Sequence, residues 1–190
     1  MTRPGFLRRI AALLIDYALI LGWMAVVALA SVGTAFITGA SADWLAWGTA
    51  VAELLGFVVL VLPVGIYLFV TENSRRQATL GKRVLGMRVV AVDGSRAPAW
   101  RILVRTVVKL LPWEFAHFLV WHAVDALARG AGFPAWLLAG LVVADLLPIA
   151  YVLTVALQRD RRGPHDLVAG TRVVRETPGE RESPADVRGS

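Results

Sequence analysis

Four long apolar runs constrain this sequence more than any other feature. They cover residues 10–30, 51–70, 110–128 and 134–157 of a 190-residue chain that is 57% hydrophobic. A helix rises about 1.5 Å per residue, so about 20 residues cross a hydrocarbon layer of ~30 Å. Each run has that length. The sequence therefore predicts an all-α integral membrane protein with four transmembrane helices and no room for a large soluble domain.

The basic residues indicate on which side of the membrane the loops lie. All 20 Lys and Arg residues except Arg129 fall before the first run, between the second and third runs, or after the fourth. Segments that flank membrane spans keep Lys and Arg on the cytoplasmic side. We therefore expect a multi-pass protein of the cell inner membrane with both termini in the cytoplasm. The first run contains Asp16 and is longer than a signal-peptide core, so we expect it to be retained as a span.

The net charge of +6 follows from the same distribution. Because the basic residues lie beside apolar runs, the expected partners are the lipid bilayer and anionic lipid of the inner leaflet, and no nucleic-acid partner is expected.

The interval 74–109 is the longest polar stretch between two runs. Its composition predicts cytoplasmic amphipathic helices that lie on the membrane surface. Within it, residues 88–92 are rich in β-branched side chains and end at Asp93-Gly94, which is a turn signal. We expect this segment to pair with residues 171–175 in a small two-stranded β ribbon. We also expect a cytoplasmic basic face formed by Lys82, Arg83, Arg101, Arg105 and Lys109.

Residues 1–175 are thus interpreted as one membrane domain. Residues 176–190, which are rich in charge, Pro and Gly, are predicted to form a disordered cytoplasmic tail.

Asp16 is the first candidate for a functional residue, because a carboxylate inside a membrane helix is costly and normally has a partner. Arg9 lies seven residues earlier on the same helix face. One interpretation is a buried ion pair that fixes the helix, with Arg105 or Lys109 as a third group. The other is a proton or cation site at Asp16.

Asp145 is the second candidate and lies near the middle of the fourth run, three residues before Pro148. A proline leaves one helical carbonyl without its donor, and a carboxylate beside that carbonyl is a possible proton or cation site. The alternative is a protonated Asp145 that hydrogen bonds to another helix.

Asp166 belongs to a sharply defined polar segment, in which Gly163-Pro164 precedes His165-Asp166 and Gly170 ends a short apolar turn. Capping of that turn is the favoured role of Asp166. The sequence has no Cys, and His117 and His122 lie about 140° apart on a helix. We therefore predict no metal site, no cofactor and no enzymatic activity.

Three segments together resemble the RDD family of bacterial membrane proteins: 9–16 (RIAALLID), 79–90 (TLGKRVLGMRVV) and 165–174 (HDLVAGTRVV). The family is named for an arginine and two aspartates, which fall on Arg9, Asp16 and Asp166. The resemblance implies a multi-pass inner-membrane protein, and some members of the family act as cation/proton antiporters. Asp145 matches no motif of the family.

Two functional hypotheses follow. The first is a small-cation or proton transport or permeation module, with Asp16 and Asp145 as the ion sites and a possible homo-oligomer, since four spans enclose little volume. The second is a non-transporting scaffold or assembly factor that binds a partner or anionic lipid at its cytoplasmic face.

Overall fold

The computed structural model describes residues 2–39, 45–158 and 160–175, and these are mostly helical. The elements in chain order are α1 (Phe6–Thr38), α2 (Thr49–Gly56), the π-helical turn η1 (Phe57–Val61), α3 (Leu62–Asn73), α4 (Leu80–Val84), β1 (Met87–Ala91), α5 (Ala99–Ala128), α6 (Ala135–Leu157), α7 (Pro164–Ala169) and β2 (Thr171–Arg175). The predicted tail at 176–190 lies outside the described residues.

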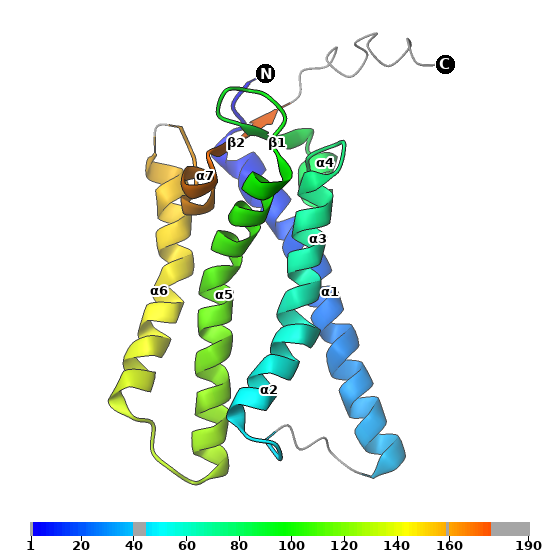
Figure 1. The fold of residues 1–190 in the computed structure, drawn as a ribbon, viewed down its shortest axis with the longest axis vertical. Coiled ribbons are helices and arrows are strands. Elements are labelled where there is room, and N and C mark those ends of the chain that lie inside the picture. Colours follow the sequence, from blue (N-terminus) through cyan, green and yellow to red (C-terminus); the bar gives the residue numbers. More distant parts are fainter. Residues whose placement is uncertain (1, 40–44, 159, 176–190) are drawn as a thin grey trace.

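The long helices extend in the same general direction, and α4, α7, β1 and β2 gather at one end of them, with α2 at the other (Figure 1). We call this the ribbon end; it carries α4, α7, β1 and β2. Thr2 forms a bridge with Arg175 at the far edge of β2, so the two ends of the described chain meet there. The chain therefore leaves the ribbon end and returns to it.

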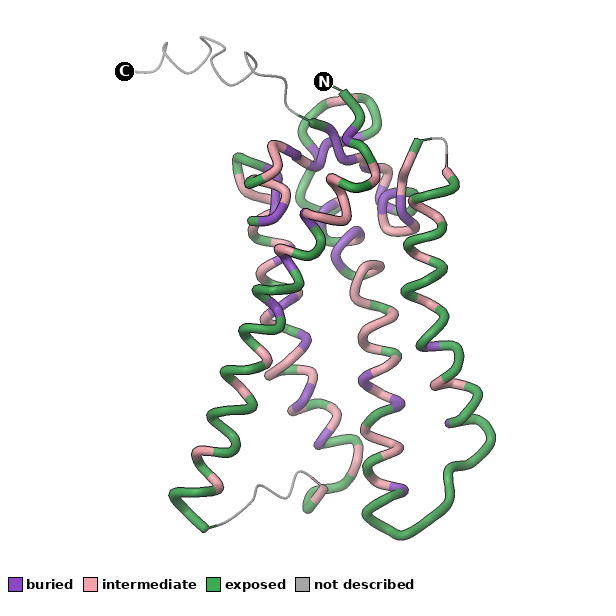
Figure 2. Tube along the Cα trace, turned by 180° about the vertical axis from the view of Figure 1, so that it is seen from behind, coloured by how far each residue is buried: buried purple, intermediate pink, exposed green. Residues whose placement is uncertain are grey.

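Three helical segments are long and apolar enough to cross a membrane: Phe6–Thr38, Thr49–Asn73 and Ala135–Leu157. Their surfaces expose many large hydrophobic side chains, such as Phe36 at 90% and Leu29 at 72%, and Figure 2 shows exposed residues along their whole length. Burial inside the protein does not account for this apolar surface, so its solvent is lipid. The chain is a membrane protein.

The predicted third span, 110–128, lies within α5 but is not one of these three candidates. Polar side chains within it, among them Glu114, His117 and His122, make this helix less apolar than the others. Four crossings are therefore not confirmed.

An aromatic side chain of α1 satisfies a carbonyl that a proline leaves free in the second segment. Pro63 has no N–H to donate to the carbonyl of Val59, four residues earlier. The helix widens into η1 just before this proline, and the indole N–H of Trp23 donates to the Val59 oxygen at 3.1 Å. An unsatisfied carbonyl in lipid is costly, so this bond joins α1 to the second segment.

The same solution recurs between α5 and α6. Pro112 lies inside α5 and leaves the carbonyl of Val108 without its helical donor. The hydroxyl of Tyr151, on α6, donates to that oxygen at 2.9 Å. The carbonyls freed by Pro63 and Pro112 thus each accept a hydrogen bond from an aromatic side chain of a neighbouring helix.

The expected β ribbon is confirmed. β1 and β2 pair antiparallel, with Val89 opposite Val173. An isolated two-stranded ribbon is marginal in water and needs further packing. Here it covers a small core of buried side chains at the ribbon end: Ala12, Met87, Val89, Ala97, Ile102 and Val173.

Candidate functional site

Asp16 is buried and accepts three hydrogen bonds from outside its own helix. The Thr79 hydroxyl donates to Oδ2 at 2.6 Å, and the Gly81 backbone N–H donates to Oδ1 at 2.9 Å. The Tyr67 hydroxyl also donates to Oδ1, at 3.0 Å, and itself accepts the Leu80 N–H. Free N–H groups at a helix start favour a negative charge. The carboxylate of α1 therefore caps the first turn of α4.

Gly81 explains why α4 can lie so close to α1. A Cβ at this position would overlap the Ala12 carbonyl and would press on the Asp16 carboxyl group. Only a residue without a side chain permits this approach, and the approach brings the α4 N–H groups within reach of Asp16.

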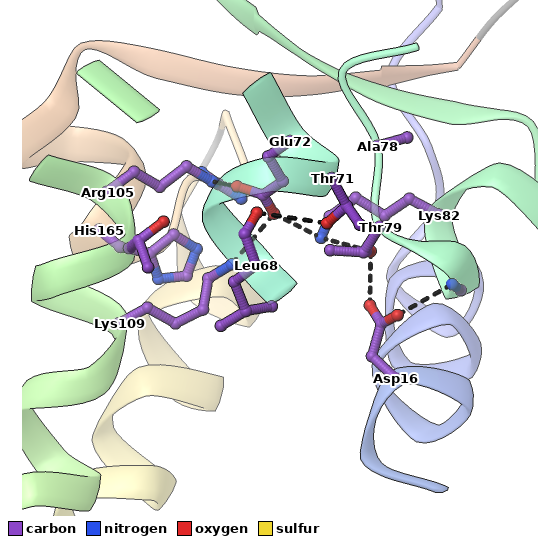
Figure 3. Close-up of polar contacts among 12 residues, drawn as sticks. Asp16, Leu68, Thr71, Glu72, Ala78, Thr79, Lys82, Arg105, Lys109 and His165 are labelled. Carbon is purple, nitrogen blue, oxygen red and sulfur yellow. Dashed lines mark hydrogen bonds and ion pairs between the residues drawn. The ribbon is translucent and has the colours of Figure 1, made fainter. Parts of the chain in front are cut away.

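Glu72 is fully buried near the end of α3 and carries three cationic partners (Figure 3). Lys82 and Lys109 reach Oε1 at 2.9 and 3.1 Å, and the Arg105 Nε reaches Oε2 at 2.8 Å. Lys82 also donates to the Thr79 hydroxyl at 3.1 Å. Glu72 is therefore connected, through Lys82 and Thr79, to the Asp16 cap.

Arg105 carries the connection to α7 and β2. Its guanidinium is almost completely buried and forms a close ion pair with Asp166. The Thr171 hydroxyl accepts from Arg105 at 3.2 Å and donates to Asp166 at 2.9 Å. Asp166 also accepts the Gly163 N–H at 3.4 Å, which is the capping contact that the sequence predicts. One carboxylate thus caps α7 and anchors it to α5.

Burial and charge act in opposite directions on Asp166. Burial alone would raise the pKa of its carboxyl group, but the Arg105 charge and the Thr171 hydroxyl together hold that pKa below its ordinary value. Burial lowers the pKa of His165 well below 6.5, and the Arg105 charge lowers it further. The arrangement therefore holds an ionised Asp166 beside a neutral His165.

We call the connected set the polar network; it consists of Asp16, Glu72, Thr79, Lys82, Arg105, Lys109, Asp166 and Thr171. Figure 3 shows its hydrogen bonds and ion pairs passing from α1 through α4 and α3 to α5. Sequence reasoning did not select Glu72, Thr79 or Thr171. An acid at the end of an apolar run, followed by a basic interval, is the signal that marks Glu72.

Arg9 has a different set of partners from the predicted one. Its guanidinium donates to the carbonyls of Arg161, at 2.5 Å, and Val173, at 3.2 Å. These contacts tie the start of α1 to the segment before α7 and to β2. Among the described residues, Arg9 and Asp16 make no ion pair with each other, although both lie at the ribbon end.

The five residues of the predicted basic face do not share one surface. Arg105, Lys82 and Lys109 are turned into the polar network. Arg83 donates to the Ala78 carbonyl and the Ser74 hydroxyl, and Arg101 donates to the Gly170 carbonyl and lies over the Trp100 ring. These side chains hold elements together more than they form an exposed patch.

Asp145 is separate from the polar network. It is exposed near the middle of α6 and has no hydrogen bond or ion pair among the described residues. The structure therefore does not bring Asp16 and Asp145 together as two parts of one ion site.

Residues 3–170 match the model of the RDD family. The chain belongs to the RDD family. The three residues that give the family its name all bind backbone or side chains at the ribbon end: Arg9 reaches β2, Asp16 caps α4, and Asp166 anchors α7.

One relative of this RDD protein is the uncharacterized protein YckC of Bacillus subtilis (strain 168). The two are 28% identical over 182 residues, which cover 96% of this chain and 91% of the relative. No solved structure matches the chain.

Proposed function

We propose that this RDD protein is a four-span inner-membrane scaffold, with its ribbon end in the cytoplasm, that binds anionic lipid headgroups and does not transport ions. The observation that carries the proposal is the state of the three buried carboxylates, Asp16, Glu72 and Asp166. Each carboxylate forms hydrogen bonds or ion pairs with donors or cations that belong to other elements of the fold. Their bonds position α4, α5 and α7.

The meeting of the chain ends supports four spans. Thr2 and Arg175 are paired at the ribbon end, so the chain runs from one end of the bundle to the other an even number of times. Three candidate spans account for an odd number. α5 supplies the return, and its 30 residues reach about 45 Å at 1.5 Å per residue.

The charge distribution supports a cytoplasmic ribbon end. Every described Lys and Arg except Arg129 lies at or near that end, whereas Arg129 follows α5 at the opposite end. Basic residues that flank spans remain on the cytoplasmic side, which supports a ribbon end that faces the cytoplasm.

The surface of the ribbon end supports contact with lipid headgroups. Leu80 and Val84 of α4 are 45% and 65% exposed, and Trp100 at the start of α5 is 60% exposed. Exposed apolar side chains on short surface helices lie at the boundary between headgroups and acyl chains. Arg75 and Arg76, on the loop before α4, are exposed and have no acidic partner among the described residues. Both are therefore free to bind a phosphate.

Native mass spectrometry of the detergent-solubilised protein tests this function. We expect the wild type to retain phosphatidylglycerol more strongly than phosphatidylcholine. The variant R75Q/R76Q should lose about five-fold in phosphatidylglycerol affinity per residue, since each well-placed cation contributes about 1 kcal/mol. R129Q is the matched control, because Arg129 is exposed at the opposite end. Equal retention of both lipids, or equal losses in the two variants, would contradict the proposal.

Cation–proton transport is the second candidate, and one observation favours it. The polar network is a continuous row of ionisable groups, which is what a proton relay requires. The row joins neighbouring helices at the ribbon end, however, and does not lead from one end of the bundle to the other (Figures 1 and 3). Its course therefore supports the scaffold more strongly than transport.

A further inference from the structure

One row of exposed positions on α6 has the spacing of a coiled-coil seam and no partner among the described residues. Its positions alternate in steps of three and four residues, and all of them are exposed: Ala135, Leu138, Val142, Asp145, Ile149, Val152 and Ala156. The row shifted by one residue, from Trp136 to Leu157, is exposed too, but only the first row contains an acidic residue, Asp145. Apolar side chains at this spacing form the contact stripe of paired helices. We call these seven residues the α6 seam.

The α6 seam lies to one side of the face through which α6 packs on the rest of the protein. α6 packs on α5 through buried Leu137 and Ala144, which contact a cluster that contains Leu119. At 100° per residue, the centre of the seam lies roughly 120° around the helix from that packed side. Within the described residues, α6 therefore presents a second, uncovered side to the lipid.

Asp145 makes this side unlike an ordinary lipid-facing surface. It is the only Asp, Glu, Lys, Arg or His in α6 and the eleventh of its 23 residues, so it lies near the middle of the bilayer. Val142 and Ile149, one turn to either side, are 60% and 55% exposed, and Asp145 itself is exposed. A carboxyl group at this depth needs a polar partner. None is present among the described residues.

We propose that the α6 seam is the interface with a second copy of this chain, with the two Asp145 carboxyl groups meeting at its centre. Two copies inserted in the same direction present parallel α6 helices, and a two-fold axis along the membrane normal brings each seam residue against its own counterpart. Asp145 therefore meets an identical group at the same depth. A hydrogen bond between the two carboxyl groups then gives each the polar partner that it lacks in one copy.

The apolar part of the α6 seam fits this arrangement. Val142 and Ile149 occupy one of the two alternating positions of the seam, and Leu138, Asp145 and Val152 occupy the other. A single polar residue at a seam position fixes the register of paired helices. In lipid, a hydrogen bond between helices also contributes to their association.

Disulfide cross-linking tests the interface, and the chain suits it because the sequence has no Cys of its own. V142C and I149C, introduced singly in inner-membrane vesicles, should form covalent dimers on mild oxidation. V143C and A150C are matched controls, since each is exposed at almost the same depth but lies more than about 100° from the centre of the seam. The controls should remain monomeric. Equal cross-linking at control and seam positions, or cross-linking of the seam only to a different polypeptide, would overturn the proposal.

The role of Asp145 is tested by measuring dimerisation in liposomes from energy transfer between labelled copies. D145L should weaken the dimer by roughly 3- to 30-fold, the range expected for one interhelical hydrogen bond in lipid. D145N preserves hydrogen bonding and should retain most of the affinity. D145L is exposed to lipid in the monomer, so it should leave the folded fraction unchanged. Wild-type affinity in D145L would overturn the central role of this residue.

Discussion

Replacing Glu72 by Gln tests whether the polar network stabilises the fold. The substitution keeps the shape of the side chain but leaves Arg105, Lys82 and Lys109 without their common carboxylate. At 2.8 Å and an effective dielectric constant of 20, the Arg105 pair has a gross Coulomb energy of about 6 kcal/mol. Desolvation of both groups offsets much of this energy.

The net change in the free energy of unfolding depends on whether each of the three cations can bind another partner or water. Removing one member of a buried ion pair costs about 3–5 kcal/mol. Arg105 keeps Asp166, and the side chains of Lys82 and Lys109 are 13% and 22% exposed, so both lysines can turn toward water. We therefore expect E72Q to lower the free energy of unfolding by about 3 kcal/mol, the lower end of that range.

The assay is unfolding in mixed micelles with increasing sodium dodecyl sulfate, followed by Trp fluorescence. E53Q is the control: it is the same substitution in the same membrane segment, and Glu53 is half-buried without a hydrogen bond or ion pair among the described residues. E53Q should change the unfolding free energy by less than about 0.5 kcal/mol. A loss in E72Q no larger than that in E53Q would refute the role of the network.

Three further perturbations test other parts of the fold. G81A should displace α4 and lower the unfolding free energy by about 1–3 kcal/mol, whereas G22A, which has open space around its Cβ, should be tolerated in the same titration. W23F removes the donor to the proline-freed carbonyl and should cost about 0.5–1.5 kcal/mol, in contrast to W47F at an exposed position. His165 should make the protein less stable in acid. Because burial keeps its folded-state pKa well below 6.5, its contribution is complete above about pH 6.5 and is lost as the pH falls and the unfolded chain binds the proton. Thermal unfolding between pH 7 and 5 should therefore vary less in H165Q than in the wild type; an equal or steeper dependence would contradict this assignment.

The membrane helices and the ribbon were predictable because their signals are local. An apolar run of about 20 residues predicts a span wherever it occurs, and α1, α6 and the second segment contain such runs. The ribbon follows from a β-branched run that ends at Asp93-Gly94. The register, with Val89 opposite Val173, then puts both valines into the core beneath the ribbon.

The polar network was only partly predictable, because its partners are distant in sequence. Arg101 and Arg105 are four residues apart on one helix, and their spacing predicts a shared surface. Instead Arg105 turns inward to Glu72, which lies 33 residues earlier, and Arg101 binds the Gly170 carbonyl. Helix periodicity states which residues share a face but not what lies against that face. The requirement for glycine at position 81 likewise depends on a tertiary contact, because it arises only where the fold brings the Ala12 carbonyl against that residue.

The most direct test of the account is pH-gradient-driven exchange of Na⁺, K⁺ and Li⁺ in proteoliposomes, measured for the wild type and D16N alongside their unfolding free energies. If the Asp16 carboxylate caps α4, the wild type should exchange these ions no faster than empty liposomes, and D16N should be less stable by about 1–3 kcal/mol. Saturable wild-type exchange that D16N abolishes with no loss of stability would contradict the account.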